Sequence, residues 1–371
     1  MKAIAAFPVE REVKLIDIEQ PKLVAPTQAK LKILDVGVCG TDREICAFQY
    51  GTPPASSKHL VIGHESLGEV VEVGSGVSGL KPGDLVVTTV RRPCPHEICV
   101  SCVTDRADFC YTGDFVERGI KSHHGFMTEY VVDEARNMNL VPAALRMVAV
   151  LVEPLTIAEK AIEQIWSLQV RLPWACPHTQ EKGMGHCHRA VVLGAGPVGL
   201  LGAMALVRQG FNTFVYSRET APNPKSSVVE SIGATYVSAA DAPVDDLAAR
   251  VGNIDVVYEA SGASQLSFEV IKRLGVNGIF VFTGVPGRKA PVAIDTDRIM
   301  RNLVLNNQVV FGSVNASRSN FQSAINDLAA FNQSWPESVS RLISGRFPVG
   351  QYRELLLGPV HGIKNVLSFA N

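Results

Sequence analysis

The first part of the chain carries short apolar runs that proline and glycine interrupt. Residues 31–36 and 84–90 are examples, rich in Leu, Ile, Val and Thr. Runs of this kind favour extended chain, and the Pro and Gly between them favour turns. The pattern over residues 2–90 therefore predicts an all-β, barrel-like unit.

From Arg189 onward, short apolar segments alternate with helical or loop segments instead. This rhythm is typical of a parallel sheet with helices on its faces. A loop rich in Gly, His, Cys and Pro, residues 174–188, precedes the first strand. The predicted strands are residues 190–193, 213–216, 235–237, 255–258 and 279–282.

The charge balance of the chain argues against polyanionic partners. Its 371 residues include 35 basic and 36 acidic side chains, so we expect no binding to nucleic acid or to a membrane surface. No apolar stretch is long enough to span a bilayer and no secretory signal is recognisable, which predicts a cytoplasmic protein. There the eight cysteines are expected to be reduced thiols or metal ligands.

A glycine-rich turn joins the first strand of the second part to a helical stretch. Gly194 permits the tight turn, Gly196 lets the backbone approach a pyrophosphate, and Gly199 lets helix and strand pack closely. The helix N-terminus adds a favourable field for phosphate. This setting favours a dinucleotide site over an ordinary tight turn. The predicted contacts in the turn are Gly194, Gly196, Pro197, Val198 and Gly199.

The end of the next strand indicates which dinucleotide binds. An NAD enzyme usually places Asp or Glu there to hold the ribose hydroxyls, but this chain has Ser217 and Arg218. The guanidinium suits a 2′-phosphate, so NADP is the preferred cofactor. Glu219 follows directly and keeps NAD use open, and a solvated Arg218 without a ligand is the alternative. Thr283 is a further predicted cofactor contact.

Residues of zinc-ligand type follow two predicted strands in the first part of the chain. Cys39 follows one strand, and His64 and Glu65 follow another. A catalytic zinc takes three protein ligands and leaves one position open. Glu153 is the candidate third ligand, with Glu65 as its competitor. Singly, His64 suits a core histidine and Cys39 an inert thiol, but together with the dinucleotide turn they favour a zinc-dependent dehydrogenase.

With these motifs, the chain resembles the medium-chain, alcohol dehydrogenase-like superfamily over nearly its whole length, and most closely its glucose 1-dehydrogenase branch. The resemblance implies an α/β protein. A GroES-like, β-rich catalytic domain, residues 1–156 and 309–371, would enclose a Rossmann domain with a doubly wound parallel sheet, residues 157–308. The segments that carry the likeness are residues 39–44, 63–68, 111–120 and 153–155.

The resemblance also assigns roles around the catalytic zinc. It implies that Cys39, His64 and Glu153 hold the metal, with the carboxylate of Glu65 adjacent to it. Thr41 takes the hydroxyl position to which the superfamily passes the substrate proton. Where many alcohol dehydrogenases place a relay histidine, this chain has Glu44. The proton is therefore expected to leave through Glu44 or directly through water.

Other positions match the sugar and cofactor contacts of the branch. Glu117 and Asn315 match residues that hold sugar hydroxyls or the nicotinamide end, and Lys364 matches a basic cofactor contact. Glu153 is also a predicted substrate contact. The leading hypothesis is NAD(P)-dependent oxidation of a glucose-like aldose at C1 to an aldonolactone. Strict glucose specificity is not expected, because three positions that are polar in some relatives are here Val90, Ile157 and Leu305.

A cysteine cluster resembles the structural zinc lobe of the superfamily. Cys99, Cys102 and Cys110 match its last three ligands, and the family spacing puts the first at His96. Cys94 lies two residues earlier. Either Cys94 or His96 would complete a closed tetrahedral site with the other three cysteines, and Cys94 is favoured. A lobe without metal, or with a disulfide, stays open.

The loop before the second part holds further residues of metal-ligand type. Gly and Pro in the same segment favour a linker. We therefore favour a linker over a third metal site. The residues concerned are Cys176, His178, His186, Cys187 and His188.

Other functions stay open on the same scaffold. They are a polyol or L-threonine dehydrogenase, a non-catalytic cofactor-binding relative and a zinc-free quinone reductase relative, of which the zinc-ligand residues disfavour the last two. Residues 308–311 have the pattern of a Rossmann edge strand, which often pairs between subunits in this superfamily. We expect a homo-oligomer, dimer or tetramer, that acts on a small sugar.

Overall fold

The computed structural model describes residues 1–174, 176–177, 183–287 and 291–370. The chain divides into two compact units, Met1–Thr156 with Asn315–Asn371, and Ile157–Val314. The second boundary thus lies after Val314 and not between residues 308 and 309. The reason is that β17 (Val309–Gly312) pairs with β16 (Ile279–Phe282) in the parallel sheet of the second unit.

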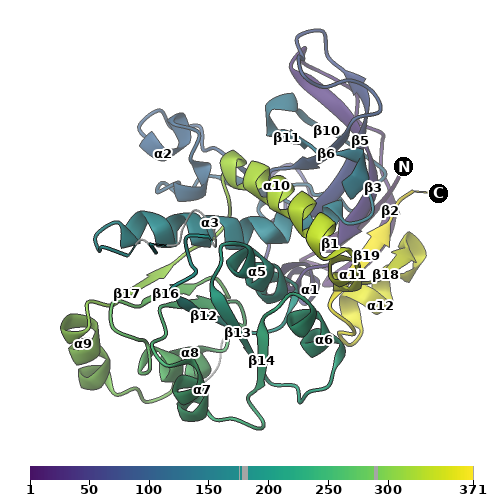
Figure 1. Ribbon diagram of the computed structural model, residues 1–371. Helices are drawn as coiled ribbons and strands as arrows, with labels where there is room; N and C mark the ends of the chain where they lie inside the picture. Colours follow the sequence, from purple (N-terminus) through teal and green to yellow (C-terminus); the bar gives the residue numbers. More distant parts are fainter. Residues whose placement is uncertain (175, 178–182, 288–290, 371) are drawn as a thin grey trace. The chain divides into compact units, whose positions relative to one another are not determined.

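The first unit consists mainly of short strands, which confirms the β-rich unit that the apolar runs predict. The strands are β1 (Lys2–Phe7), β2 (Glu12–Asp17), β3 (Gln28–Gly37), β4 (Leu60–Val61), β5 (Glu65–Val73), β6 (Leu85–Thr88), β7 (Arg91–Arg92), β8 (Val116–Arg118), β9 (Ser122–His123), β10 (Tyr130–Glu134), β11 (Met138–Leu140), β18 (Ile343–Pro348) and β19 (Lys364–Ser368). The largest sheet has seven strands in the order β11-β6-β5-β3-β19-β18, with β10 also paired to β3. The C-terminal strands, yellow in Figure 1, therefore complete a sheet that the N-terminal part begins.

Helices, most of them short, connect these strands. They are α1 (Gly40–Cys46), α2 (Val100–Val103), η1 (Ala107–Phe109), η2 (Ala135–Asn137), η3 (Ala143–Leu145), η4 (Ala149–Leu151), α10 (Arg318–Ser334), α11 (Pro336–Leu342), η5 (Val349–Gln351) and α12 (Tyr352–Leu357). The helix α3 (Val152–Gln169) begins in the first unit and continues into the second. Within the described part of the chain, no helix is both long and apolar enough to cross a membrane.

A buried ion network fastens the small antiparallel strand pair β7 and β8 to the large sheet. Oδ2 of Asp133, on β10, lies 2.5 Å from Arg92 Nη2 and 2.9 Å from Arg118 Nε. Its Oδ1 accepts a hydrogen bond from Asn137 Nδ2 at 2.9 Å. Burial alone raises the pKa of Asp133, but the two guanidinium groups hold it well below its ordinary value. One residue from each strand of this pair, Arg92 on β7 and Arg118 on β8, is therefore anchored to Asp133.

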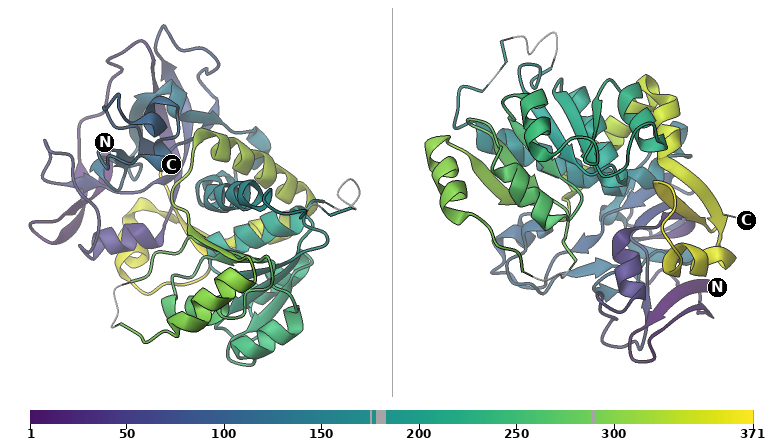
Figure 2. Two further views of the ribbon diagram at one scale, coloured as in Figure 1. Left: turned by 90° about the vertical axis from the view of Figure 1, so that its left-hand side faces the viewer. Right: turned by 90° about the horizontal axis from the view of Figure 1, so that it is seen from below.

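The second unit is a six-stranded, all-parallel sheet with helices on both faces (Figures 1 and 2). Its elements are β12 (Arg189–Leu193), α5 (Pro197–Arg208), β13 (Asn212–Ser217), α6 (Pro224–Ser231), β14 (Thr235–Ser238), α7 (Val244–Val251), β15 (Val256–Glu259), α8 (Ser264–Ile271), β16, α9 (Thr296–Leu305) and β17. The strands lie in the order β14-β13-β12-β15-β16-β17. The chain adds strands on one side of β12 and then on its other side, which confirms the doubly wound fold. A core that includes Val191, Tyr216 and Phe280 fills one side.

The loop before β12 contains a disulfide between Cys176 and Cys187. Their Cα atoms are 5.6 Å apart, within the normal range for a disulfide. The expectation that all thiols are reduced is therefore wrong for this pair. His188 stacks on Trp174 with the ring centroids 4.0 Å apart, so Cys176, Cys187 and His188 each have a structural partner. His178 lies outside the described residues.

Candidate functional site

Cys39, His64 and Glu65 meet at one end of the largest sheet, with their ligand atoms within 4.8 Å of one another. The register of β3 against β5, which places Gly37 opposite Glu65, brings the segments together. A Cβ at Gly37 would lie only 2.2 Å from Glu65 Oε2, so the absence of a side chain there admits the carboxylate. A thiolate, an imidazole and a carboxylate together form a donor set that suits zinc.

Asp42 contacts two of the three residues in this cluster. Its Oδ2 accepts a hydrogen bond from the Cys39 backbone N–H at 2.9 Å, and its Oδ1 lies 3.2 Å from His64 Nδ1. Burial alone lowers the pKa of His64, but Asp42 and Cys39 raise it well above its ordinary value. The contact at Nδ1 leaves Nε2 for a metal. Sequence reasoning missed Asp42, although it stands at the capping-box position of α1.

Lys364, which resembles a cofactor contact in sequence, lies buried against the cluster instead. Its Nζ is 2.7 Å and 2.6 Å from the two carboxylate oxygens of Glu65 and 3.2 Å from Val38 O. Burial alone lowers the pKa of Lys364, but Glu65 raises it above its ordinary value. The geometry therefore makes the ammonium the counter-ion of Glu65, because its donors are used there and it is only 2% exposed.

Glu153 lies in the first turn of α3, outside the group of three ligand atoms. Burial raises the pKa of Glu153 to about 7, His64 lowers it and Glu65 raises it. The carboxylate is thus within electrostatic range of the cluster without belonging to it. On α1, Thr41 is half-buried and Glu44 is exposed.

Glu117 and Asn315, far apart in the chain, meet within the first unit. Asn315 Nδ2 donates a hydrogen bond to Glu117 Oε1 at 2.8 Å. Burial raises the pKa of Tyr50, Glu117 raises it further, and Arg91 and His64 lower it. Gly119, two residues after Glu117, lies directly against Gly63, the residue before His64, because a Cβ at Gly119 would lie 2.3 Å from Gly63 O. The chain segments that carry the two groups of residues are therefore neighbours.

The four cysteines of the lobe form a second compact cluster. The sulfur atoms of Cys94, Cys99, Cys102 and Cys110 all lie within 4.8 Å of one another. His96 is outside this group, with Nε2 2.5 Å from Asp114 Oδ2. Burial raises the pKa of Cys110, but hydrogen bonds from the Thr112 hydroxyl and the Gly113 backbone N–H lower it to about 6. The geometry places Cys94, and not His96, at the fourth corner.

The glycine turn of the second unit has the shape that a dinucleotide requires. Gly194 has a φ of 102°, which favours glycine. A Cβ at Gly199 would lie 2.0 Å from Gly194 O, whereas one at Gly196 would meet no atom within 4 Å. The helix α5 begins at Pro197, so Pro197 and Val198 belong to its first turn. Backbone N–H groups and open space therefore meet at a helix N-terminus.

Charged side chains surround the end of β13. Ser217 is its last residue and Arg218 is exposed, with no ion pair among the residues that the structure describes. Glu219 Oε1 lies 2.5 Å from Lys225 Nζ. The carboxylate that would oppose a 2′-phosphate is thus already paired.

Thr283 and a residue that sequence reasoning missed, Glu259, stand at the ends of adjacent strands. Thr283 Oγ1 donates to Glu259 O at 2.7 Å. The buried Glu259 carboxylate accepts hydrogen bonds from the backbone N–H groups of Ser261 and Gly262 at 2.7 and 2.8 Å. Glu259 therefore shapes the loop at the carboxyl edge of the sheet, where ligands of such folds bind.

Two family models match the chain. Residues 25–143 match the alcohol dehydrogenase GroES-like domain, and residues 146–369 match the glucose dehydrogenase C-terminus. Glucose 1-dehydrogenase of Methanocella arvoryzae is 37% identical over 365 residues, 98% of each chain. Glucose 1-dehydrogenase of Thermoproteus tenax is 36% identical over 369 residues, 99% of each chain.

The fold is also that of solved structures. Haloferax mediterranei glucose dehydrogenase in complex with NADP, Zn and gluconolactone is 30% identical, has a TM-score of 0.87 and is matched over 100% of both chains. Galactitol-1-phosphate dehydrogenase of Escherichia coli, at 19% identity and a TM-score of 0.78, shares the fold alone. The two-unit architecture is thus common to the whole length of these chains.

Proposed function

Because the chain belongs to the glucose dehydrogenase branch of the medium-chain, alcohol dehydrogenase-like superfamily, we propose that it oxidises a glucose-like aldose at C1 to an aldonolactone with NAD(P) and zinc. One observation carries the proposal: the cluster of Cys39, His64 and Glu65 lies in the same unit as the Glu117–Asn315 pair, and Gly119 of the one segment packs against Gly63 of the other. A metal cluster beside hydroxyl-binding side chains suits a sugar alcohol group.

The residues present fit a catalytic zinc. Cys39 and His64 would hold it, and either Glu65 or Glu153 would supply the carboxylate. Lys364 neutralises Glu65, which limits the negative charge around the metal. When bound, zinc supplies a Lewis acid for the C1 hydroxyl, and the nicotinamide ring supplies the acceptor for the C1 hydride.

The roles of the remaining residues follow from their chemistry. Thr41 would accept the hydroxyl proton and pass it to Glu44 or to water, and Glu117 and Asn315 would orient the sugar. The four lobe cysteines would hold a structural zinc, because four sulfur atoms within 4.8 Å suit a closed tetrahedral site.

The second unit would bind the dinucleotide. The turn from Gly194 to Gly199 would receive the pyrophosphate, and Ser217 and Arg218 would receive the adenosine ribose with its 2′-phosphate. The pairing of Glu219 with Lys225 supports NADP as the preferred cofactor, with NAD as a weaker one. Thr283 would lie near the nicotinamide end.

Assembly and location complete the proposal. β17 is an edge strand of the parallel sheet, and pairing of this edge between subunits would give a dimer or tetramer. Nicotinamide dinucleotides are held inside cells, which supports the cytoplasm as the place of action.

A substrate panel tests the proposal directly. The purified chain is assayed for formation of reduced nicotinamide with aldoses, polyols and L-threonine, each with NADP and NAD, and its zinc content is measured by elemental analysis. We expect turnover of aldoses, a lactone product and two zinc ions per chain. Turnover confined to polyols or L-threonine, or no turnover of any substrate, contradicts it. Loss of turnover in Cys39→Ser with cofactor binding retained would support the assigned metal site.

A further inference from the structure

Arg91 makes a buried, direct contact with Glu117. The antiparallel register of β7 and β8 places the two residues opposite each other. Arg91 Nε and Nη2 each lie 3.0 Å from Glu117 Oε1, and the two side chains are only 8% and 7% exposed. A pair with this burial and two contacts on one oxygen is held in place far more firmly than a solvated surface pair.

The backbone beneath this pair is itself anchored. Successive residues of a strand point to opposite faces. Arg92 and Arg118, the neighbours of Arg91 and Glu117, both bind Asp133 on the large sheet. The β7-β8 strand pair is therefore fastened through one face while the other face presents the Arg91–Glu117 pair.

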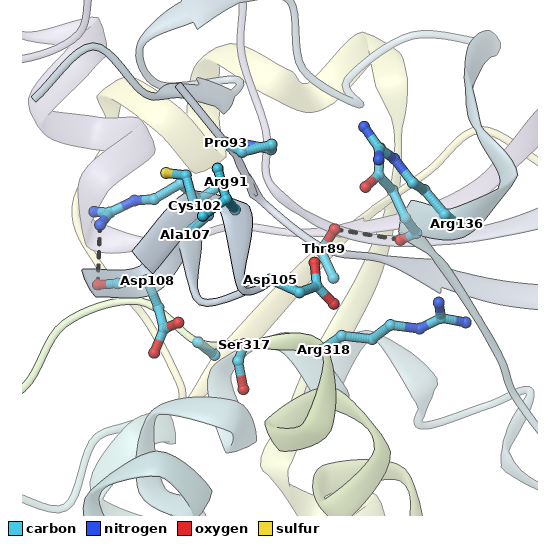
Figure 3. A pocket seen from close by; sticks show the side chains of 13 residues that line it. Thr89, Arg91, Pro93, Cys102, Asp105, Ala107, Asp108, Arg136, Ser317 and Arg318 are labelled. Atoms are coloured by element: carbon cyan, nitrogen blue, oxygen red, sulfur yellow. Dashed lines mark hydrogen bonds between the residues drawn. The ribbon is translucent and has the colours of Figure 1, made fainter. Parts of the chain in front are cut away.

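The guanidinium of Arg91 is also held on its outer side. Its carbon atom lies 3.7 Å from the ring centroid of Phe115, a close cation–π contact. Nη1 donates a hydrogen bond to Asp108 O at 3.3 Å, the dashed line beside Arg91 in Figure 3. Asp108 lies in η1, two residues before Cys110 of the cysteine lobe. The lobe thus contributes to the position of Arg91.

These contacts leave the two oxygens of Glu117 unequal. Oε1 accepts from Arg91 Nε and Nη2 and from Asn315 Nδ2. Within the described ranges no donor reaches Oε2, and this oxygen is not sealed from solvent. A carboxylate pinned through one oxygen keeps the other in a fixed direction, so a ligand hydroxyl meets a preorganised acceptor.

We propose that Arg91 is a positioning residue for the sugar: it pins Oε1 of Glu117 so that Oε2 accepts a hydrogen bond from one hydroxyl of the aldose other than that at C1. The proposal rests on the proposed function, because it needs an aldose at this site. Arg91 itself does not touch the sugar. Its effect is confined to the one hydroxyl that Glu117 binds.

A cycle of variants and deoxy sugars tests this role. The ratio of kcat/KM for the parent aldose to that for each monodeoxy aldose is measured in the wild type and in Glu117→Ala, which identifies the hydroxyl concerned. A hydrogen bond to a charged group predicts a wild-type ratio of roughly ten to a hundred at that hydroxyl. In Arg91→Met we expect this ratio to fall toward one, with KM rising more than kcat falls, while ratios at the other hydroxyls stay unchanged.

Arg106→Met is the matched control. Arg106 also binds an acid of the lobe, Asp108, at 3.0 Å and also lies over an aromatic ring, that of Phe109. Its partners Asp108 and Phe109 belong to the lobe, so the deoxy-sugar ratios should stay at the wild-type values. Zinc content and NADP affinity are measured in both variants to show that the metal sites and the cofactor site are intact.

The outcomes separate the two proposals. If Arg91→Met keeps the wild-type ratio at every hydroxyl, the positioning role is overturned. If that variant does not fold, Arg91→Lys decides, because an ammonium keeps the charge but not the two-point contact; a partial fall in the ratio supports the role and an unchanged ratio overturns it. If the wild type oxidises no aldose at all, the proposed function has failed, and the positioning role falls with it.

Discussion

The NADP preference is expected to depend on one exposed guanidinium, that of Arg218. Because Arg218 has no ion pair among the described residues, Arg218→Ala should change the free energy of unfolding by less than about 0.5 kcal/mol. A charge-assisted hydrogen bond to a 2′-phosphate contributes about 1.5–3 kcal/mol, and solvent exposure favours the lower end. We therefore expect kcat/KM for NADP to fall about tenfold and that for NAD to stay constant.

The neighbouring ion pair supplies a control of opposite sign. Lys225 Nζ lies 2.5 Å from Glu219 Oε1, so Glu219→Gln removes a negative charge and frees an ammonium beside the phosphate position. We expect the NADP/NAD ratio of kcat/KM to rise in Glu219→Gln and to fall in Arg218→Ala. Equal losses with both cofactors in Arg218→Ala, or an unchanged ratio in both variants, would refute the reasoning, because neither residue would then face the 2′-phosphate.

Three further predictions follow from single contacts. Asp133→Asn leaves two buried guanidinium groups without their anion and should lower the free energy of unfolding by about 3 kcal/mol in urea titrations at neutral pH. The pKa of Asp133 is depressed in the folded protein. Its contribution to stability is therefore complete above about pH 4 and is lost as the pH falls further. Gly199→Ala puts a methyl group 2.0 Å from Gly194 O and should abolish NADP binding in fluorescence titrations, and a variant that binds normally would contradict the assigned turn. Cys176→Ser opens the disulfide to Cys187, whose sequence separation is 11, and should cost roughly 2–3 kcal/mol of stability under oxidising conditions; equal unfolding of variant and wild type without reductant would count against it.

Local patterns in the sequence were sufficient for most of the fold. The central strands of the second unit, β12, β15 and β16, are buried on both faces, so each stands out as an apolar run, and β16 begins and ends at the predicted residues. The edge strand β17 is only half-buried; it is predicted as a Rossmann edge strand, but the predicted domain boundary cuts it off from that sheet. Its membership depends on pairing with β16, a contact that no local pattern contains.

The candidate site divides in the same way. The cysteine lobe lies within residues 94–110, so its ligands could be proposed from spacing. The pairing of Lys364 with Glu65 joins residues 299 positions apart, and a lysine after a loop carries no sign of which carboxylate it will neutralise. The family resemblance suggests that Lys364 is a cofactor contact. In the structure its ammonium is buried, and an unpaired buried charge would be far more costly than a paired one. Burial therefore favours Glu65 as the partner of Lys364.

Arg91 shows what kind of information was missing. Two consecutive arginines in an apolar neighbourhood must point to opposite faces of any strand they form, so the sequence already implies that each needs its own buried anion. The candidates are many, and only the register of β7 against β8 assigns Glu117 to Arg91 and leaves Asp133 to Arg92. A slip of one residue would exchange the two faces and turn the Glu117 carboxylate toward the large sheet. The register of these two short strands therefore determines where Glu117 points, and the Asp133 network that fastens them supports the proposed sugar site without being part of it.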